Sequence, residues 1–581
     1  MGQGTRPRAT TLALAASLVF GCARHAPVAS PAATVPPPRL LVTIVVDQLA
    51  AWIAAERWPQ LAADGGFARL RREGLYVEDL RYEHSVTDTA PGHAALFTGN
   101  VPAQTGIFAN ETLPSTGGPA RSILADPATQ VVGVDTGVVT GPGKEGSSLA
   151  RLTGDTVADR FVAEVPGAQV FSFSLKDRAT LFGSGRTPDV ALWLDTDLGE
   201  LVTSTKFPTP PSWVRPLAGK AAVTAAAQVG WRLTEAEQVW VQAHAETADI
   251  SPGEGSPAGL GDHFPHPIQS AKALRGTAQG DVLLFGLARA AIEVARNNHR
   301  PTLLALSFSS HDYVGHIFGP HSWEAWDELY RLDRALADFF ATLDGAFGPD
   351  GYAVMLSADH GSVALPELAG TANDPWCKHA QDAHDDRWQR ACGPRLRVDT
   401  RAATAAVEAA LVAALGAGPW TIGISDPYLH LTAQASALPA ERRTLLLATV
   451  AKVLQPMGFA EVIDARAVRP PCGRGEALAD LLCSAISPRG DGDLYLVVRP
   501  GTFLGVVALE GHGINHGSPY LYDRSVPLLV RAPGRVAPGK VRHTPASFAT
   551  FARTASALLG VHAPATDRPG EDLTVSSSGS P

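Results

Sequence analysis

The chain has 581 residues, of which 45% are hydrophobic and 18% charged, and its formal net charge is −9. This composition excludes a disordered or low-complexity protein, and the length allows one large domain with insertions or two domains. Lysine and arginine alternate with acidic residues and form no basic stripe, so we expect no nucleic-acid binding.

The N-terminus has the order of a secretory signal. Arg6 and Arg8 precede an apolar run over 12–20, which is too short to span a bilayer comfortably. We therefore expect residues 1–22 to be a signal peptide and the mature protein to be exported.

The end of this signal resembles a bacterial lipoprotein cleavage box at 19–22, with Phe20 as an atypical member. Either Cys22 becomes the lipidated first residue, or it is removed with the signal. The Ala-, Pro- and Val-rich stretch 23–38 is then a tether. The expected location is the periplasm or, through lipidated Cys22, the outer membrane.

Beyond the tether, short apolar runs alternate with helical patterns. Runs typical of buried strands cover 41–46, 170–174, 303–308, 352–356 and 526–530. Helical spacing of apolar residues covers 67–73, 324–343, 402–415 and 548–559. This alternation predicts an α/β fold over 39–575, with a mostly parallel central sheet flanked by helices. Residues 576–581 are expected to be a frayed tail.

Two stretches, at about 198–279 and 372–493, interrupt this alternation, and we interpret both as insertions that cap the active edge of the sheet. The second insertion contains four cysteines. In an oxidising compartment these allow three connectivities. Pairing Cys377 with Cys392 and Cys472 with Cys483 closes the shortest loops, whereas zinc binding is disfavoured because no Cys-x-x-Cys spacing occurs.

Acidic residues and histidines follow three of the predicted strands. Asp47 ends the run 41–46, Asp312 and His316 follow 303–308, and Asp359 and His360 follow 352–356. In an open parallel sheet such residues meet beyond the carboxyl ends of the strands. The spacing of four places Asp312 and His316 on one face of a helix.

With His516, these residues make three aspartates and three histidines. Such a set could give three protein ligands to each of two zinc ions, since zinc binds both imidazole nitrogen and carboxylate oxygen. A capped helix or a satisfied core histidine explains any single member, but not the whole set. Two metal ions about 3.5–4 Å apart stabilise the attacking and the leaving oxygen of an in-line displacement, so the set predicts phosphoryl transfer.

Several motifs resemble the alkaline phosphatase superfamily: VDQ at 46–48, TAPGH at 89–93, TGNVP at 98–102 and GIFAN at 106–110. Within it, three others are similar to the PafA-type alkaline phosphatases, which use a threonine nucleophile: SLKDR at 174–178, DYVGH at 312–316 and HGSP at 516–519. The resemblance extends from about Leu40 to Leu559.

The resemblance implies two zinc ions per chain. The first would be held by Asp47, Asp359, His360 and Thr89, and the second by Asp312, His316 and His516. It further implies that Thr89 is the nucleophile of a phosphothreonine intermediate, and that the phosphoryl oxygens are held by Asn110, Lys176 and Arg178. The expected function is a phosphomonoesterase that acts on small-molecule phosphate esters.

Other residues compete for these roles. Ser85 and Thr87 are alternative nucleophiles, although neither is joined directly to the Ala-Pro-Gly-His turn. His512 competes with His516, which is favoured by its motif, and His93 is expected to be structural. Four further histidines are expected to be surface or cap residues: His263, His266, His379 and His384.

Other enzyme classes use many of the same metal ligands and site residues. Phosphodiesterases of the nucleotide pyrophosphatase type share the metals, the threonine and the asparagine but lack the Lys and Arg pair, so Lys176 and Arg178 favour a monoester dianion. A phosphonate hydrolase stays open. A sulfatase needs a modifiable Cys or Ser where Thr89 stands, and a lipoprotein that only binds a metal or a partner would tolerate loss of that nucleophile.

Overall fold

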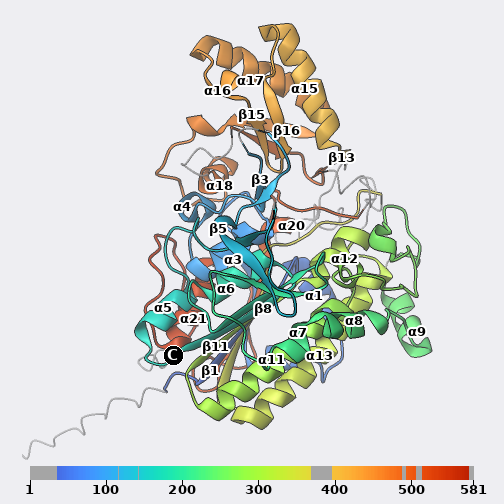
Figure 1. Ribbon diagram of the computed structural model, residues 1–581, viewed down its shortest axis with the longest axis vertical. Coiled ribbons are helices and arrows are strands. Elements are labelled where there is room, and N and C mark those ends of the chain that lie inside the picture. Colours follow the sequence, from blue (N-terminus) through green and yellow to red (C-terminus); the bar gives the residue numbers. More distant parts are fainter. Residues whose placement is uncertain are drawn as a thin grey trace, which may run out of the picture.

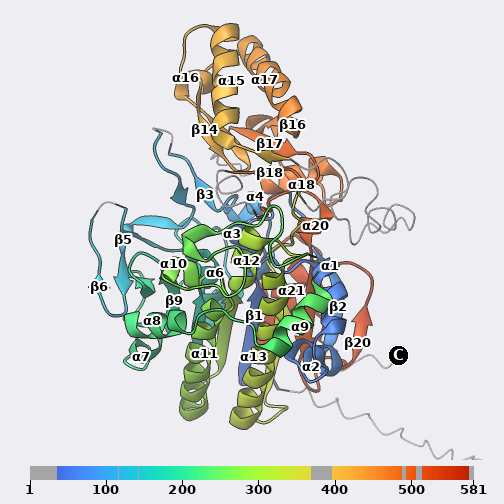
Figure 2. The ribbon, with the colours of Figure 1, turned by 90° about the vertical axis from the view of Figure 1, so that its right-hand side faces the viewer.

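The computed structural model describes residues 36–114, 117–141, 143–245, 247–367, 396–486, 493–505 and 513–574. The predicted Cys377–Cys392 pair lies outside these ranges, as do Cys22, His379, His384 and His512. Figures 1 and 2 show a sheet between two layers of helices, with a smaller unit projecting from one end. No helix in the described ranges is long and apolar enough to cross a membrane.

Five parallel strands form the centre of a 13-stranded sheet. Their order is β12 (Tyr352–Ser357), β1 (Leu40–Val46), β11 (Thr302–Phe308), β8 (Gln169–Ser174) and β9 (Val190–Asp195). Every residue of β1, β8, β11 and β12 is buried. Continuous apolar runs form such strands because helices cover both faces of a parallel sheet.

The strands directly beside this parallel centre are antiparallel. Beside β12 lie β19 (Ser525–Arg531) and β2 (Leu75–Arg81), and beside β9 lie β10 (Glu200–Ser204) and β5 (Ala125–Gly133). Short strands complete the two edges: β20 (Lys540–Arg542), β21 (Ala546–Ser547), β6 (Gly137–Val138) and β7 (Glu145–Ser147). The sheet is therefore mixed, and its parallel part is the centre that the apolar runs predicted.

Helices cover both faces. One layer contains α3 (Thr89–Thr98), α5 (Val157–Glu164), α6 (Asp177–Ser184) and α21 (Ala549–Leu559). The other contains α2 (Gly66–Glu73), α11 (Gln279–Asn298) and α13 (Trp323–Phe347). The predicted helix 324–343 corresponds to α13, which begins after Ser322, whose side chain accepts a hydrogen bond from Ala325 N.

Described residues from 396–464 and 494–498 build the projecting unit at the top of Figure 1. Its four strands are antiparallel, in the order β14 (Thr421–Ser425), β15 (Tyr428–Leu431), β17 (Leu494–Val498) and β16 (Phe459–Asp464). Two helices, α15 (Thr400–Leu415) and α17 (Ala440–Leu454), pack on it around a separate apolar core that includes Val407, Leu446 and Leu494.

A second irregular stretch leaves the sheet after β10 and contains α7 (Arg215–Ala218), α8 (Lys220–Gln228), α9 (Glu235–His244) and α10 (Ala271–Leu274). It packs on α11 and α13. His266 of this stretch, expected to be a surface or cap residue, is buried within the stretch, and its Nε2 lies 3.0 Å from Glu324 Oε1. His266 is therefore an interior residue of the insertion and not a surface residue.

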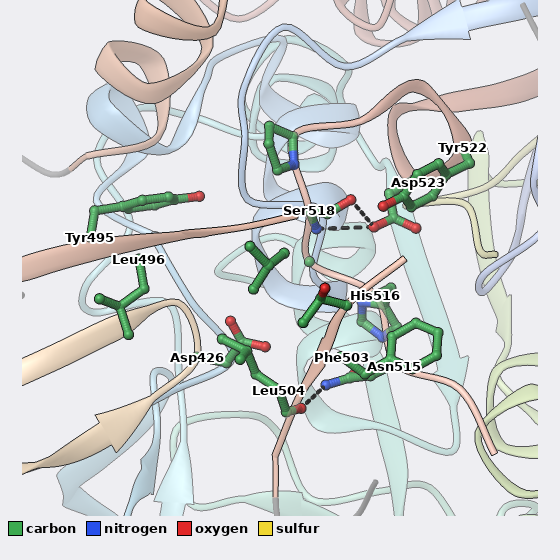
Figure 3. Close-up of a pocket in the computed structure, with 14 residues that line it drawn as sticks. Asp426, Tyr495, Leu496, Phe503, Leu504, Asn515, His516, Ser518, Tyr522 and Asp523 are labelled. Carbon is green, nitrogen blue, oxygen red and sulfur yellow. Dashed lines mark hydrogen bonds between the residues drawn. The ribbon is translucent and has the colours of Figure 1, made fainter. Parts of the chain in front are cut away.

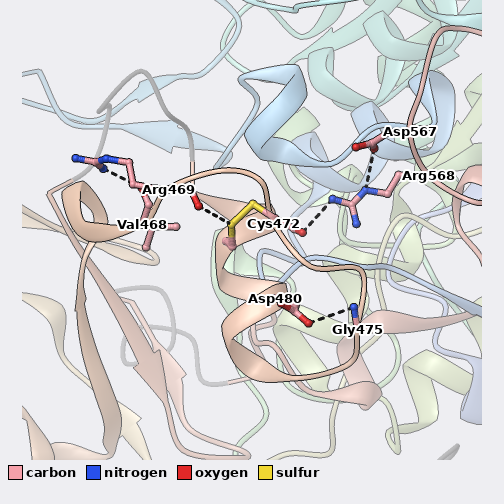
Figure 4. Close-up of a disulfide and its surroundings, with 9 residues drawn as sticks. Val468, Arg469, Cys472, Gly475, Asp480, Asp567 and Arg568 are labelled. Carbon is pink, nitrogen blue, oxygen red and sulfur yellow. Dashed lines mark hydrogen bonds and ion pairs between the residues drawn. A yellow bond between two sulfur atoms is a disulfide. The ribbon is translucent and has the colours of Figure 1, made fainter.

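The Cys472–Cys483 disulfide is present, as predicted, and joins the loop before α18 (Leu478–Ala485) to that helix (Figure 4). The loop is also held by the Gly475 N–H, which donates to Asp480 Oδ2. Leu481 O of α18 accepts a hydrogen bond from Ser85 N. The crosslink therefore fixes a helix that contacts the main body.

Replacing both Cys472 and Cys483 with serine is expected to lower the free energy of unfolding by about 3 kcal/mol, because the bond closes a loop of this length in the unfolded chain. The two cysteines are 11 residues apart. Denaturant unfolding of the double variant and the wild type measures the difference. Labelling of both cysteines by a thiol reagent, without prior reduction of protein from its native compartment, would contradict the crosslink.

Candidate active site

The candidate site lies beyond the carboxyl ends of the central strands. Asp47 directly follows β1, and Lys176 follows β8. Asp312 and His316 lie on α12 (Ser310–Phe318), which follows β11. Asp359 comes two residues after the end of β12. The parallel topology thus brings together side chains that are hundreds of residues apart in the sequence.

Six of the predicted residues form two groups of three. In each group the candidate ligand atoms lie within 4.8 Å of one another. The first group is Asp47, Asp359 and His360, and the second is Asp312, His316 and His516. This is the same division into two ion sites that the sequence resemblance implied.

The first group has buried polar atoms that lack hydrogen bonds. Asp47 Oδ1 and His360 Nε2 are two such atoms, whereas Asp47 Oδ2 lies 2.6 Å from Lys176 Nζ and Asp359 Oδ2 lies 3.1 Å from His93 Nδ1. His360 Nε2 lies 3.4 Å from Asp47 Oδ1 and 3.6 Å from Asp359 Oδ2. Burying polar groups without partners is unfavourable. Converging oxygen and nitrogen donors of this kind fit a metal ion such as zinc.

The three histidines are oriented with Nε2 toward the groups. Each Nδ1 lies at hydrogen-bond distance from a backbone oxygen: His316 at 2.8 Å from Ile514 O, His360 at 3.0 Å from Gly361 O, and His516 at 2.9 Å from Thr87 O. A carbonyl oxygen accepts a hydrogen bond only from a protonated nitrogen, so Nδ1 carries the proton in each ring. The lone pair of Nε2 is then available to bind a metal ion. Metal-binding histidines are commonly fixed in this way.

Gln48 connects the two groups. Its backbone N donates to Asp359 Oδ1 at 3.1 Å, and its side-chain Nε2 donates to Asp312 Oδ1 at 2.7 Å. The residue has a φ of 68°, and a Cβ atom on Gly315 would lie 2.1 Å from Gln48 Oε1. In the sequence, the place of Gln48 in the VDQ motif is its only signal, and it predicts no bridging role.

The electrostatic field of the site favours cations. Burial opposes protonation of His516, but Asp312 and Asp88 outweigh this effect and hold its pKa well above the usual range. Burial also acts to raise the pKa of Asp312, but His316 and Lys176 lower it well below its usual value. The same carboxylate charge would attract a divalent ion between these ligands.

Thr89 is the first residue of α3 and is buried at the site. Lys176 Nζ donates to Thr89 Oγ1 at 3.2 Å. Asn110 Oδ1 accepts a hydrogen bond from Ala90 N at 2.8 Å, which leaves the Asn110 amide group as its remaining donor. A Cβ atom on Gly92 would lie 2.2 Å from Asp359 O, so this glycine permits α3 to approach the end of β12 closely.

Lys176 lies between the two ligand groups. Its Nζ is 2.6 Å from Asp47 Oδ2 and 2.5 Å from Asp312 Oδ2. Burial opposes its charge, but these two carboxylates outweigh burial and raise the pKa of Lys176. Arg178 makes only a 3.9 Å ion pair, with Asp177, in the described part of the chain, and its buried Nε has no hydrogen-bond partner. Its guanidinium donors therefore remain for a ligand.

The competing residues have other partners. Ser85 Oγ lies 2.8 Å from Tyr495 Oη, and Thr87 Oγ1 donates to Ser518 O at 2.9 Å. The ring nitrogens of His93 are 2.9 Å from Thr89 O and 2.9 Å from Ser307 Oγ. His93 thus joins α3 to the sheet, in keeping with a structural role.

A small pocket beside His516 includes residues of the projecting unit (Figure 3). Asp426, between β14 and β15, and Tyr495 of β17 line it together with His516 and Ser518. Burial raises the pKa of the Asp426 carboxyl, and nearby Asp88 adds to this effect. The free volume is about 10 Å³, enough for a single water. This pocket is therefore too small to hold an organic phosphate ester.

Comparisons with known proteins identify a matching family and several similar proteins. The sequence model of the type I phosphodiesterase / nucleotide pyrophosphatase family matches residues 41–139 and 189–416. A protein from Myroides odoratus named calcium-transporting ATPase is 28% identical over 520 residues, which cover 87% of this chain and 88% of that protein. Alkaline phosphatase PafA from Elizabethkingia meningoseptica is 33% identical over 337 residues, which cover 57% of this chain and 61% of PafA.

The crystal structure of wild-type PafA is also similar in three dimensions. Its TM-score with this chain is 0.74, at 25% sequence identity, and the match covers 91% of this chain and 97% of that one. The mixed sheet and its two helical layers therefore have a counterpart in a solved structure.

Proposed function

Because this chain belongs to the type I phosphodiesterase / nucleotide pyrophosphatase family, a phosphoester hydrolase family of the alkaline phosphatase superfamily, we propose that it is a phosphomonoesterase. The observation that carries the proposal is a lysine in contact with the nucleophile and a second cation close enough to feel the charge of two ligand carboxylates, Asp47 and Asp312. Lys176 contacts Thr89 directly, and Arg178, two residues further on, has donors without a strong carboxylate partner. A monoester presents a dianion, which two cations neutralise better than one.

The proposed reaction uses Thr89 as nucleophile. Its Oγ1 attacks phosphorus, the bond from phosphorus to the leaving oxygen breaks, and water then hydrolyses the phosphothreonine to release phosphate. Lys176 is placed to stabilise negative charge on Oγ1 by its hydrogen bond. Arg178 and the remaining amide group of Asn110 would bind the phosphoryl oxygens, on which charge must be stabilised.

Two zinc ions would be held by the two ligand groups, with Thr89 beside the first. When bound, they supply positive charge that lowers the pKa of a hydroxyl and stabilises a leaving oxygen. The protein's own contribution is orientation: Gln48 and the backbone carbonyls fix the carboxylates and imidazoles before any ion arrives.

Replacing Lys176 and Arg178 together with alanine is expected to lower kcat/KM for p-nitrophenyl phosphate by about 10³-fold or more, because each contributes to transition-state charge stabilisation. Hydrolysis of bis(p-nitrophenyl) phosphate, which has the same leaving group but one charge fewer, should fall by less than about tenfold. Steady-state kinetics on both esters measures the difference.

The matched control replaces Arg215 and Lys220 with alanine. These are an exposed arginine and lysine at the starts of α7 and α8, which form ion pairs with Asp135 and Glu200, and both activities should be retained. If the Lys176 and Arg178 variant lost monoester and diester activity equally, the two cations would not determine a preference for monoesters. The phosphodiesterase function that names the family would then be the better assignment.

A further inference from the structure

A cavity of about 270 Å³ lies between α8, α11 and α13, which pack together in one helical layer (Figure 1). Its walls are mostly apolar and include Ala226, Val229, Ala278, Phe285, Leu332 and Ala335. Val229 and Val282, which also line it, are exposed, so the cavity is open to solvent. A cavity of about 150 Å³ can hold benzene, so this one has room for a small organic ligand.

Gln279, at the start of α11, brings a hydrogen-bond acceptor without a donor to this cavity. The residue lines the cavity and is only 8% exposed. Its buried Oε1 has no hydrogen-bond partner in the part of the chain that the structure describes. A buried acceptor without a donor is unfavourable. A ligand that donates a hydrogen bond inside the cavity would remove this cost.

Two buried acidic side chains, Asp281 and Glu328, also line the cavity. Burial raises the pKa of the Asp281 carboxyl well above its usual range, and the charge of Glu328 adds to this effect. Arg331 lines the cavity too, but its charge is balanced by Asp327, at 2.6 Å, and by Glu237, at 3.3 Å. The two acidic groups therefore favour a positively charged ligand.

The start of α12 holds both acidic side chains in place. Asp281 Oδ1 accepts a hydrogen bond from Ser309 N, and its Oδ2 accepts one from Ser310 N, both at 3.2 Å. Glu328 Oε2 lies 2.7 Å from His311 Nδ1. A ligand would therefore meet acceptors that are already oriented, which lowers the entropic cost of binding.

We propose that this cavity is a binding site for a small organic ammonium ion that carries an apolar group. The ammonium has three donors, which match Gln279 Oε1 and the carboxyls of Asp281 and Glu328. The apolar group packs against Phe285 and Leu332. None of the residues that line the cavity is a candidate metal ligand, so this site is separate from the candidate active site.

Benzylamine is the probe, and calorimetric titration of the metal-loaded protein measures its binding. We expect saturable binding of one molecule per chain. Benzyl alcohol has the same ring without the positive charge, and methylamine has the charge without the ring. Each should bind about tenfold more weakly or worse, because one loses charge-assisted hydrogen bonds and the other loses the apolar contacts.

Two variants locate the bound probe. Gln279→Met removes the acceptor from a side chain of similar size and should weaken benzylamine binding about tenfold. Ala335→Phe places a ring in the cavity and should abolish saturable binding. Gln238→Met is the matched control, because Gln238 is an exposed glutamine of α9 that does not line the cavity, and it should bind benzylamine as the wild type does.

Three results would overturn the site. The first is that the wild type shows no saturable binding, and the second is that benzyl alcohol binds as tightly as benzylamine. The third is unchanged binding by Gln279→Met, since benzylamine would then be bound elsewhere, for example at a metal ion. Binding is measured without a phosphate ester, so failure of the phosphomonoesterase proposal would leave this test intact.

Discussion

Replacing Thr89 with alanine is expected to lower kcat/KM for p-nitrophenyl phosphate on the order of 10³-fold or more, because the substitution removes covalent catalysis. The hydroxyl lies at the start of α3, where Lys176 donates to it, and none of the six Asp and His ligands is altered. The zinc content should therefore stay unchanged. Kinetics and elemental analysis on the same preparation measure both quantities.

Two neighbouring hydroxyls provide the controls. Ser85→Ala and Thr87→Ala should retain most activity, since their hydroxyls contact Tyr495 and Ser518 and not the ligand groups. Thr89→Ser should retain a measurable part of the activity because it keeps a hydroxyl nucleophile. If Thr89→Ala kept more than a tenth of the wild-type rate, another group would have to be the nucleophile.

Removal of the metal ions is expected to abolish hydrolysis, and zinc should restore it. The wild type should hold about two zinc ions per chain, and Asp312→Ala and Asp359→Ala should each hold about one fewer, because each keeps only two ligands in the altered group. Zinc should also raise the unfolding temperature of the metal-free protein, since an ion that binds the folded state stabilises it.

Asp333→Asn is the control for these metal measurements. Asp333 is a buried aspartate of α13 that accepts a hydrogen bond from Phe67 N, away from both ligand groups, so the variant should keep both ions. Full activity in excess chelator, together with one tightly held magnesium ion, would contradict the two-zinc centre.

The central part of the fold could be predicted from the sequence because its strands are continuous apolar runs. The runs at 41–46, 303–308 and 352–356 lie within β1, β11 and β12, and each structural strand extends the run by a single residue. The antiparallel flanks could not be predicted in this way. For example, β5 contains exposed and half-buried residues, and its pairing with β10 depends on contacts that are distant in the sequence.

The candidate site, too, could be predicted only in part from the sequence. Aspartates and histidines beyond strand ends are visible in the sequence, because topology alone brings such positions together. Gln48 was not visible as a bridge: its function depends on a positive φ and on two hydrogen bonds to residues more than 260 positions away.

The Cys472–Cys483 disulfide has a consequence for how the protein is produced. It holds α18, whose Leu481 carbonyl accepts the Ser85 N–H, on the segment that leads to the nucleophile. Thioredoxin and glutathione keep such cysteines reduced in most bacterial cytosols. Protein made there would lack this crosslink, so secretion to an oxidising compartment is the better route to a homogeneous preparation with an ordered catalytic segment.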